Sequence, residues 1–185
     1  MKKVVTIAFI LAGMLQADTL LEYYENYNIK SSSSIVDGKK SGVSRVFFEN
    51  GNIETEISYK DDKLDGHSIK YYQNRNVKSD ETYKNGKLNG PLKKYYRNSN
   101  LMYEANFVDE KLEGLATEYY ENGNVKSQTM YKNGQMNGLK KFYVENGNIE
   151  KEILFKDDKP VEGFFYNAHG LKRKMDKTEL ENETK

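Results

Sequence analysis

The stretch GHSIKYYQNRNVKSDETYKNGKLN, residues 66–89, is one copy of a 24-residue unit that repeats along the chain. In each copy an aromatic pair is followed by an Asn-Gly-like turn, an aliphatic residue, a further aromatic residue and a second turn. Self-similarity at a fixed period of this length is typical of a repeat architecture, in which each unit packs only against its neighbours. Copies begin at five glycines: Gly42, Gly66, Gly90, Gly114 and Gly138.

Each unit contains two short runs rich in Tyr, Val, Ile and Thr, which are residues that favour β-strands. In the quoted copy these runs are 67–72 and 77–83. Asn-Gly can place both of its residues at positive φ, so we predict a two-residue type I′ hairpin at both turns. The expected fold is all-β, an elongated antiparallel β-meander built from about seven 24-residue β-hairpin repeats. The end of the chain could add a short C-terminal helix.

Two-residue turns also predict which side chains share a face, because residues that flank such a turn lie opposite each other. One face should then bury four rows of apolar residues: Tyr24, Phe48, Tyr72, Tyr96 and Tyr120; Ile29, Ile53, Val77, Leu101, Val125 and Ile149; Tyr59, Tyr83, Phe107, Tyr131 and Phe155; Leu64, Leu88, Leu112 and Met136.

The other face should carry the first aromatic residue of each pair among charged residues. This aromatic ladder is the predicted partner-binding site, formed by Phe47, Tyr71, Tyr95, Tyr119 and Tyr143. Aromatic rings offer broad apolar contact to a protein or a glycan. The alternative is that stacked rings only stabilise a thin sheet through contacts between strands.

The chain is predicted to consist of a signal peptide at 1–17, a repeat domain at 18–174 and a charged C-terminal tail at 175–185. A charged start, an apolar run over 4–15 and a small residue at Ala17 are typical of a secretory signal. The apolar run is too short to span a bilayer, so a membrane-spanning protein is not expected. A buried first strand or helix is the alternative. Export to the periplasm or the extracellular space follows from the signal peptide.

Composition argues against several other classes of protein. Charged residues make up 31% of the chain, but the net charge is only +1, which gives no electrostatic reason to bind nucleic acid. The absence of cysteine excludes disulfides and thiol catalysis. The two histidines, His67 and His169, occupy different repeat positions, and the pairs Asp61-Asp62 and Asp157-Asp158 stand where other units have Asn-Gly. We therefore predict no catalytic residues, no metal site, no cofactor and no enzyme activity.

The recurring pattern G-x4-Y-Y-x-N-G-x-[IVL], followed by Y-K-[ND]-[GD]-K-[LM]-x-G, resembles the bacterial MORN-repeat variant of proteins often labelled YwqK-like antitoxins. The resemblance covers nearly all of the chain after the predicted signal, and it implies a β-meander used as an interaction scaffold.

The expected function is that of an exported, non-enzymatic scaffold for protein–protein interaction at the bacterial envelope. One alternative is an antitoxin-like protein that neutralises a toxin, and another is a binder of glycans or surface polymers through the tyrosine ladder. Because one sheet leaves an apolar face open to water, a homodimer or a partner surface could cover it.

Overall fold

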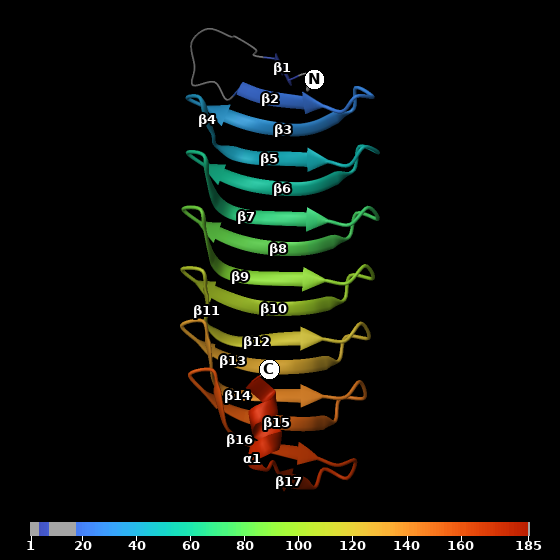
Figure 1. Cartoon of the computed structure of the whole chain (residues 1–185). Helices are drawn as coiled ribbons and strands as arrows, with labels where there is room; N and C mark the ends of the chain where they lie inside the picture. Colours follow the sequence, from blue (N-terminus) through green and yellow to red (C-terminus); the bar gives the residue numbers. More distant parts are fainter. Residues whose placement is uncertain (1–3, 8–17, 185) are drawn as a thin grey trace. The chain divides into compact units, whose positions relative to one another are not determined.

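The computed structural model describes residues 4–7 and 18–184, and Figure 1 labels their strands in chain order. The chain divides into two compact units. The first unit comprises Met1–Asn89 and Arg97–Ser99, and the second comprises Gly90–Tyr96 and Asn100–Lys185. The first contains β1 (Val4–Ile7), β2 (Asp18–Tyr23), β3 (Ile29–Val36), β4 (Lys39–Lys40), β5 (Gly42–Phe47), β6 (Ile53–Lys60), β7 (Lys63–Tyr71) and β8 (Val77–Lys84). Strand β9 (Lys87–Tyr95) belongs to the second unit from Gly90 onward. The second also contains β10 (Leu101–Val108), β11 (Lys111–Leu112), β12 (Gly114–Tyr119), β13 (Val125–Lys132), β14 (Gln135–Tyr143), β15 (Ile149–Lys156), β16 (Lys159–Tyr166), β17 (Lys172–Lys174), α1 (Lys177–Glu181) and the 3₁₀ helix η1 (Asn182–Thr184).

Within each unit, strands that follow one another in the sequence pair antiparallel. Seven hairpins occur among the described residues: β2–β3, β5–β6, β7–β8, β9–β10, β12–β13, β14–β15 and β16–β17. The all-β antiparallel meander of hairpin repeats and the short C-terminal helix are therefore confirmed.

The second turn of each repeat has the predicted two-residue form. Asn85 and Gly86 have φ of 52° and 85°, as a type I′ turn requires, and the flanking residues Lys84 and Lys87 continue strands β8 and β9. The acidic pairs take the same conformation, with Asp157 at 49° and Asp158 at 64°. Their prediction as turn substitutions is confirmed, because Asp and Asn tolerate positive φ better than most residues.

The first turn differs from the prediction. Only its third residue has positive φ, as at Arg75 (72°), and Arg75 N–H donates to the carbonyl of Tyr72 at 2.9 Å. Tyr72 N–H donates to the carbonyl of Asn76 at 2.9 Å, so three residues form the loop. The Oδ1 atom of Asn74 accepts from the N–H of Asn76 at 3.2 Å. The asparagine thus stabilises the turn with its side chain and leaves positive φ to the next residue.

This longer loop changes the register of each hairpin. Val77 pairs with Tyr71 rather than with Tyr72, and a register shift follows at Lys70. The same pairing joins the ladder residue to the aliphatic residue in the other hairpins. The predicted placement of the aliphatic row on the face opposite the ladder is therefore wrong, because it assumed a loop one residue shorter.

The glycine that begins each repeat sits in an irregularity of the ladder of backbone hydrogen bonds. Gly138 has φ of 124°, and a Cβ atom there would lie 2.9 Å from the Cβ of Met130. At Gly66 φ is 106°, and a Cβ would lie 3.0 Å from the Cβ of Ser58. Both the backbone conformation and the close approach favour glycine, which explains why the period is visible at this residue.

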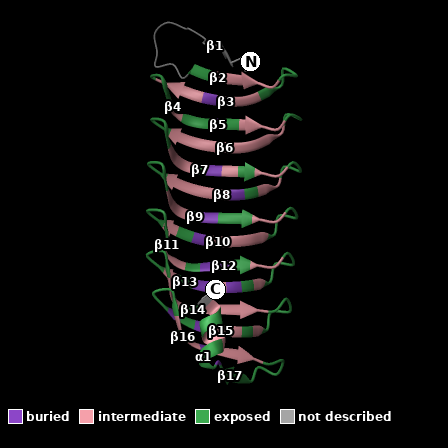
Figure 2. Cartoon of the chain, in the orientation of Figure 1, coloured by how far each residue is buried: buried purple, intermediate pink, exposed green. Residues whose placement is uncertain are grey.

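Small residues form most of the buried centre of the sheet. In the first unit Ser44, Ser68 and Ser79 are buried, and in the second unit Ala105 and Ala116 are buried. Figure 2 shows buried segments within the strands and exposed turns at their ends. Among the rows predicted to be buried, Phe155 is buried and the others are half-buried or, at Ile29, exposed. We call the face with these small residues the core face, and the opposite one the ladder face.

Neighbouring repeats are joined by side chain and turn hydrogen bonds at both ends of the strands. At the first turns, the side-chain amide of Asn124 donates to the carbonyl of Glu145 at 2.7 Å. At the second turns, the N–H of Gly134 donates to the carbonyl of Leu112 at 2.8 Å. The same turn bond recurs at Asp158 in the second unit. The first unit has both kinds of bond, because the side-chain amide of Asn28 donates to the carbonyl of Glu49 and the turn amides of Asp62 and Gly86 donate to the preceding repeat.

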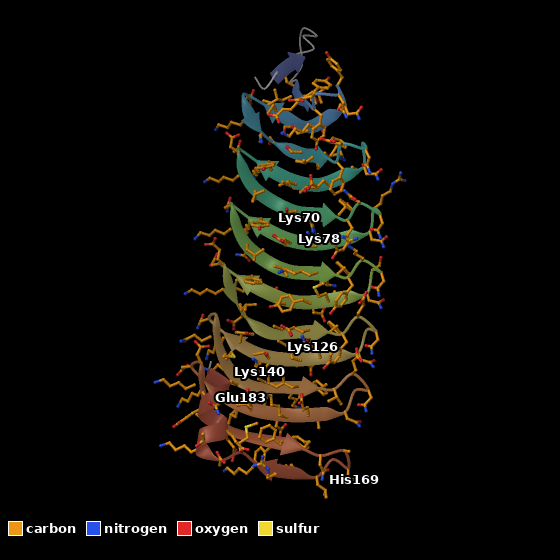
Figure 3. All side chains as sticks on the ribbon, turned by 45° about the vertical axis from the view of Figure 1, so that its right-hand side comes forward. Lys70, Lys78, Lys126, Lys140, His169 and Glu183 are labelled. Atoms are coloured by element: carbon orange, nitrogen blue, oxygen red, sulfur yellow. The ribbon has the colours of Figure 1, made fainter. Side chains whose placement is uncertain are left out.

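The C-terminal segment covers the core face of the last repeats. Ile153, Phe155 and Met175 form a buried cluster that Leu180 of α1 helps to cover. Asp176 caps the start of the helix: its side chain accepts from the N–H of Glu179, and the Glu179 carboxylate accepts from the N–H of Asp176. Such a capping box stabilises the first turn of a helix. Glu183, labelled in Figure 3, joins this segment to β15, because its Oε1 atom lies 2.6 Å from Lys151 Nζ.

The predicted signal peptide at 1–17 lies mostly outside the described residues. Val4–Ile7 is described as strand β1, antiparallel to β2. Export through this segment stays a prediction.

Candidate functional site

The ladder residues end the first strand of successive hairpins. Phe47 and Tyr71 lie in the first unit, and Tyr95, Tyr119 and Tyr143 lie in the second. All five side chains are half-buried, and each lies opposite an aliphatic residue: Ile53, Val77, Leu101, Val125 and Ile149 in that order. Each of these five repeats therefore places an aromatic ring beside a valine, isoleucine or leucine side chain.

The polar tips of three ladder tyrosines are engaged within the chain. The Tyr71 hydroxyl donates to Glu56 Oε2 at 3.1 Å, and the Tyr119 hydroxyl donates to Glu104 Oε1 at 2.6 Å. The Tyr143 hydroxyl donates to Gln128 Oε1 at 3.1 Å. Each partner stands 15 residues earlier, so the bond is a property of the repeat. These phenols stabilise the sheet, and their rings are what the ladder can offer to a ligand.

The second aromatic residue of each pair has a structural role. The hydroxyl of Tyr120 donates to the carbonyl of Tyr143 at 2.7 Å, and that of Tyr96 donates to the carbonyl of Tyr119 at 2.7 Å. In the first unit Tyr24 donates to the carbonyl of Phe47 at 2.6 Å. The second residue thus fixes the backbone of the next ladder position.

The strongest exposed apolar feature of the ladder face was not predicted. Leu115, Met130, Leu139 and Leu154 are 47%, 39%, 42% and 38% exposed, and we call them the leucine row. Leu115 lies opposite Met130, Leu139 lies opposite Leu154, and Met130 lies against Gly138 between the two pairs. A comparison of the repeats position by position would have found them, because the equivalent residues of the first unit are mostly polar.

The histidines and the acidic pairs lie apart from one another in the described residues. His67 lies on β7, with Nδ1 2.8 Å from Asp80 Oδ1 at an exposed site, and His169 lies at the turn between β16 and β17 (Figure 3). Within residues 4–7 and 18–184 no group of three or more His, Asp or Glu residues is arranged to hold a metal ion. The carboxylates of Asp61-Asp62 and Asp157-Asp158 belong to turns, where Asp158 Oδ1 accepts from the N–H of Met136 at 2.7 Å.

Several of the structural repeats coincide with sequence segments that match a known repeat family. Four segments match the MORN repeat variant: residues 40–61, 88–109, 112–133 and 136–157. Between the first two MORN-variant repeats the chain has another copy in phase, and the structure gives it the same register, since Gly66 pairs with Tyr83 as Gly42 pairs with Tyr59. MORN repeats are commonly scaffolds that bind proteins or membranes and are generally non-enzymatic.

A search of curated proteins found no significant match to this chain. None of the described helices is long and apolar enough to cross a membrane.

Burial and neighbouring carboxylates raise the pKa of several tyrosines. Burial is the largest cause at Tyr119, and together with the hydrogen bond to Glu104 it raises the pKa to about 12. Burial and the nearby Glu56 carboxylate also raise the pKa of Tyr71. The hydrogen bond to Glu152 and burial raise the pKa of Tyr166 to about 12.

These raised values predict a loss of stability at high pH. A tyrosine with a pKa near 10.0 when unfolded and about 12 when folded stabilises the fold fully below pH 10. That contribution is lost as the pH rises through 12, so the free energy of unfolding should fall between these values. Urea unfolding across this range measures the loss, and absorbance of tyrosinate measures the titration.

Glu104→Gln should lower the pKa of Tyr119 and reduce the alkaline loss, because the neighbouring negative charge is removed. Glu25→Gln, at an exposed turn, is the matched control. Titration of every tyrosine near pH 10 in the folded protein would contradict this account.

Proposed function

We propose that this protein is an exported, non-enzymatic repeat scaffold that binds a partner protein at the bacterial envelope through its ladder face. The observation that carries the proposal is the distribution of exposed apolar side chains within the strands. Val43 in the first unit is 40% exposed, and Leu115 and Leu139 in the second are 47% and 42% exposed. All three stand on the ladder face, four residues before a ladder aromatic. Clustered exposed apolar residues beside aromatic rings are typical of protein-binding surfaces.

The contacts of the ladder favour a protein over a glycan as its ligand. A glycan needs hydrogen-bond partners as well as apolar ring faces, because its own surface is rich in hydroxyl groups. The hydroxyls of Tyr71, Tyr119 and Tyr143 already donate to side chains of the chain itself. A partner protein can use the rings and the neighbouring aliphatic residues without those donors.

Export is supported by the charged start and the apolar run of residues 1–17. Fractionation of the native host combined with intact-mass measurement of the protein tests it. We expect a chain that begins at Asp18 in the envelope or the medium. An uncleaved chain in the cytoplasm would contradict export and favour the antitoxin-like alternative, with a toxin as partner.

If the ladder binds the partner, removal of its aromatic rings should weaken that binding. The partner is first identified by affinity purification with the full-length protein, then purified and titrated. Tyr119→Ala with Tyr143→Ala should weaken its binding about tenfold or more, because interface aromatics are often the main contributors to affinity. Tyr131→Ala, which removes a half-buried ring from the core face, is the matched control.

Circular dichroism and thermal unfolding establish that each variant is folded before its binding is compared. Equal affinity of the ladder variant and the wild type for the purified protein would contradict the proposal. Retention of a polysaccharide in place of a protein would favour the glycan alternative.

A further inference from the structure

The leucine row distinguishes the second unit from the first. On the first strand of each hairpin, Leu115 and Leu139 occupy the repeat position that Val43 and His67 occupy in the first unit. On the returning strand, Met130 and Leu154 occupy the position of Ser58 and Thr82. The pairing is the same in both units, since Val43 lies opposite Ser58 and His67 lies opposite Thr82.

The fold does not require leucine or methionine at these positions. Ser58 and Thr82 pair in the same register as Met130 and Leu154, and Gly66 approaches Ser58 as Gly138 approaches Met130. An exposed apolar side chain in water gains nothing from the hydrophobic effect. A contiguous row of four such residues on adjacent strands therefore points to a surface that another molecule covers.

Lysines border the leucine row along the second turns. Lys132 follows Met130 by two residues on β13, and Lys156 follows Leu154 by two residues on β15, so both stand on the ladder face. Lys159 lies directly opposite Lys156. All three are exposed, and among the described residues none of them forms an ion pair.

The carboxylates around the row are already engaged within the chain. Glu152 accepts from the Tyr166 hydroxyl at 2.5 Å, and Glu162 pairs with Lys174 at 2.7 Å. At the adjacent turn Asp158 accepts from the N–H of Met136, and Asp157 accepts from the side-chain amide of Asn137 at 2.9 Å. The surface therefore offers ammonium groups that lack carboxylate partners.

We propose that the leucine row binds a partner protein whose contact surface is an apolar strip bordered by carboxylates. The inference rests on the proposed function and adds the contact residues and the chemistry of the partner. Leu115, Met130, Leu139 and Leu154 contribute the apolar contact, and Lys132, Lys156 and Lys159 contribute the charge. A second copy of this chain fits less well, because its own carboxylates on this face are engaged and its lysines would meet lysines.

Photo-crosslinking in the native host identifies what covers the row. A photo-reactive amino acid replaces Leu139 in the full-length protein, and His67, its equivalent in the first unit, is the matched control position. We expect a protein partner that crosslinks at 139 and not at 67, through a segment rich in Asp and Glu. A second copy of the chain at 139, or equal crosslinking at both positions, overturns the proposal.

The purified partner is then titrated with folded variants. Leu115→Ser with Leu139→Ser should weaken binding about tenfold or more, because the complex would lose the apolar surface that these two leucines bury against the partner. His67→Ser, at the equivalent position of the first unit, should leave binding unchanged. Lys156→Glu with Lys159→Glu should weaken binding to a similar extent and reduce its dependence on salt.

The outcomes separate this inference from the proposed function. A partner whose affinity falls with Tyr119→Ala and Tyr143→Ala but not with the leucine variants overturns the inference and leaves the scaffold function standing. A folded protein with no protein partner in either experiment overturns both. If neither salt nor the lysine substitutions change the affinity, the partner's contact surface has no border of carboxylates, and that part of the inference is wrong.

Discussion

Hydrogen bonds from one repeat to the backbone of its neighbour fix the register on which the rest of each unit depends. The side chain of Asn76 reaches the carbonyl of Arg97 at 2.8 Å, and the N–H of Gly86 reaches the carbonyl of Leu64 at 2.7 Å. A single sheet buries little apolar surface, and the buried centre of this one is mainly Ser, Thr and Ala. Side chain to backbone bonds at both ends of the strands therefore matter more here than in a two-layer fold, where a thick apolar core would hold the strands together.

This constraint separates the residues that hold the sheet from the residues that are free to vary. Turn asparagines, repeat glycines and the second aromatic residue of each pair make contacts that recur in each unit. In the leucine row only the approach of the repeat glycine recurs, at Met130 as at Ser58, and it accommodates different side chains. There the repeats differ: His67 and Thr82 in one hairpin correspond to Leu139 and Leu154 in another. Repeat proteins commonly place their specificity on positions that the repeat itself does not need. The C-terminal segment adds the complementary feature, because Met175 and Leu180 pack against Ile153 and Phe155 on the core face.

Much of the fold could be predicted from the sequence, because a 24-residue period with paired turns leaves few alternatives to a meander. The acidic turns were also predictable, since Asp157-Asp158 replaces Asn-Gly in phase. The first turn was not, because Asn-Gly fits both a two-residue loop with two positive φ values and a three-residue loop with one. Arg75 and Ser99 at the positive-φ position are the signal that only one such residue is needed. The ladder residues occupy equivalent strand ends, as the period predicted, and their role in partner binding stays a prediction. The engagement of Tyr119 by Glu104 depends on a register that periodicity alone does not give.

Amide hydrogen exchange at the second turns tests the coupling between repeats most directly. In an isolated two-residue hairpin, the N–H of the second turn residue has no partner within the hairpin, so it exchanges rapidly with water. In this protein the corresponding N–H groups of Asp62, Gly86, Gly134 and Asp158 donate to the preceding repeat at 2.7 to 3.0 Å. The account predicts that these four amides are protected in the folded protein. Exchange of all four at the rate of an unstructured chain would contradict the claim that repeat-to-repeat hydrogen bonds hold the sheet in register.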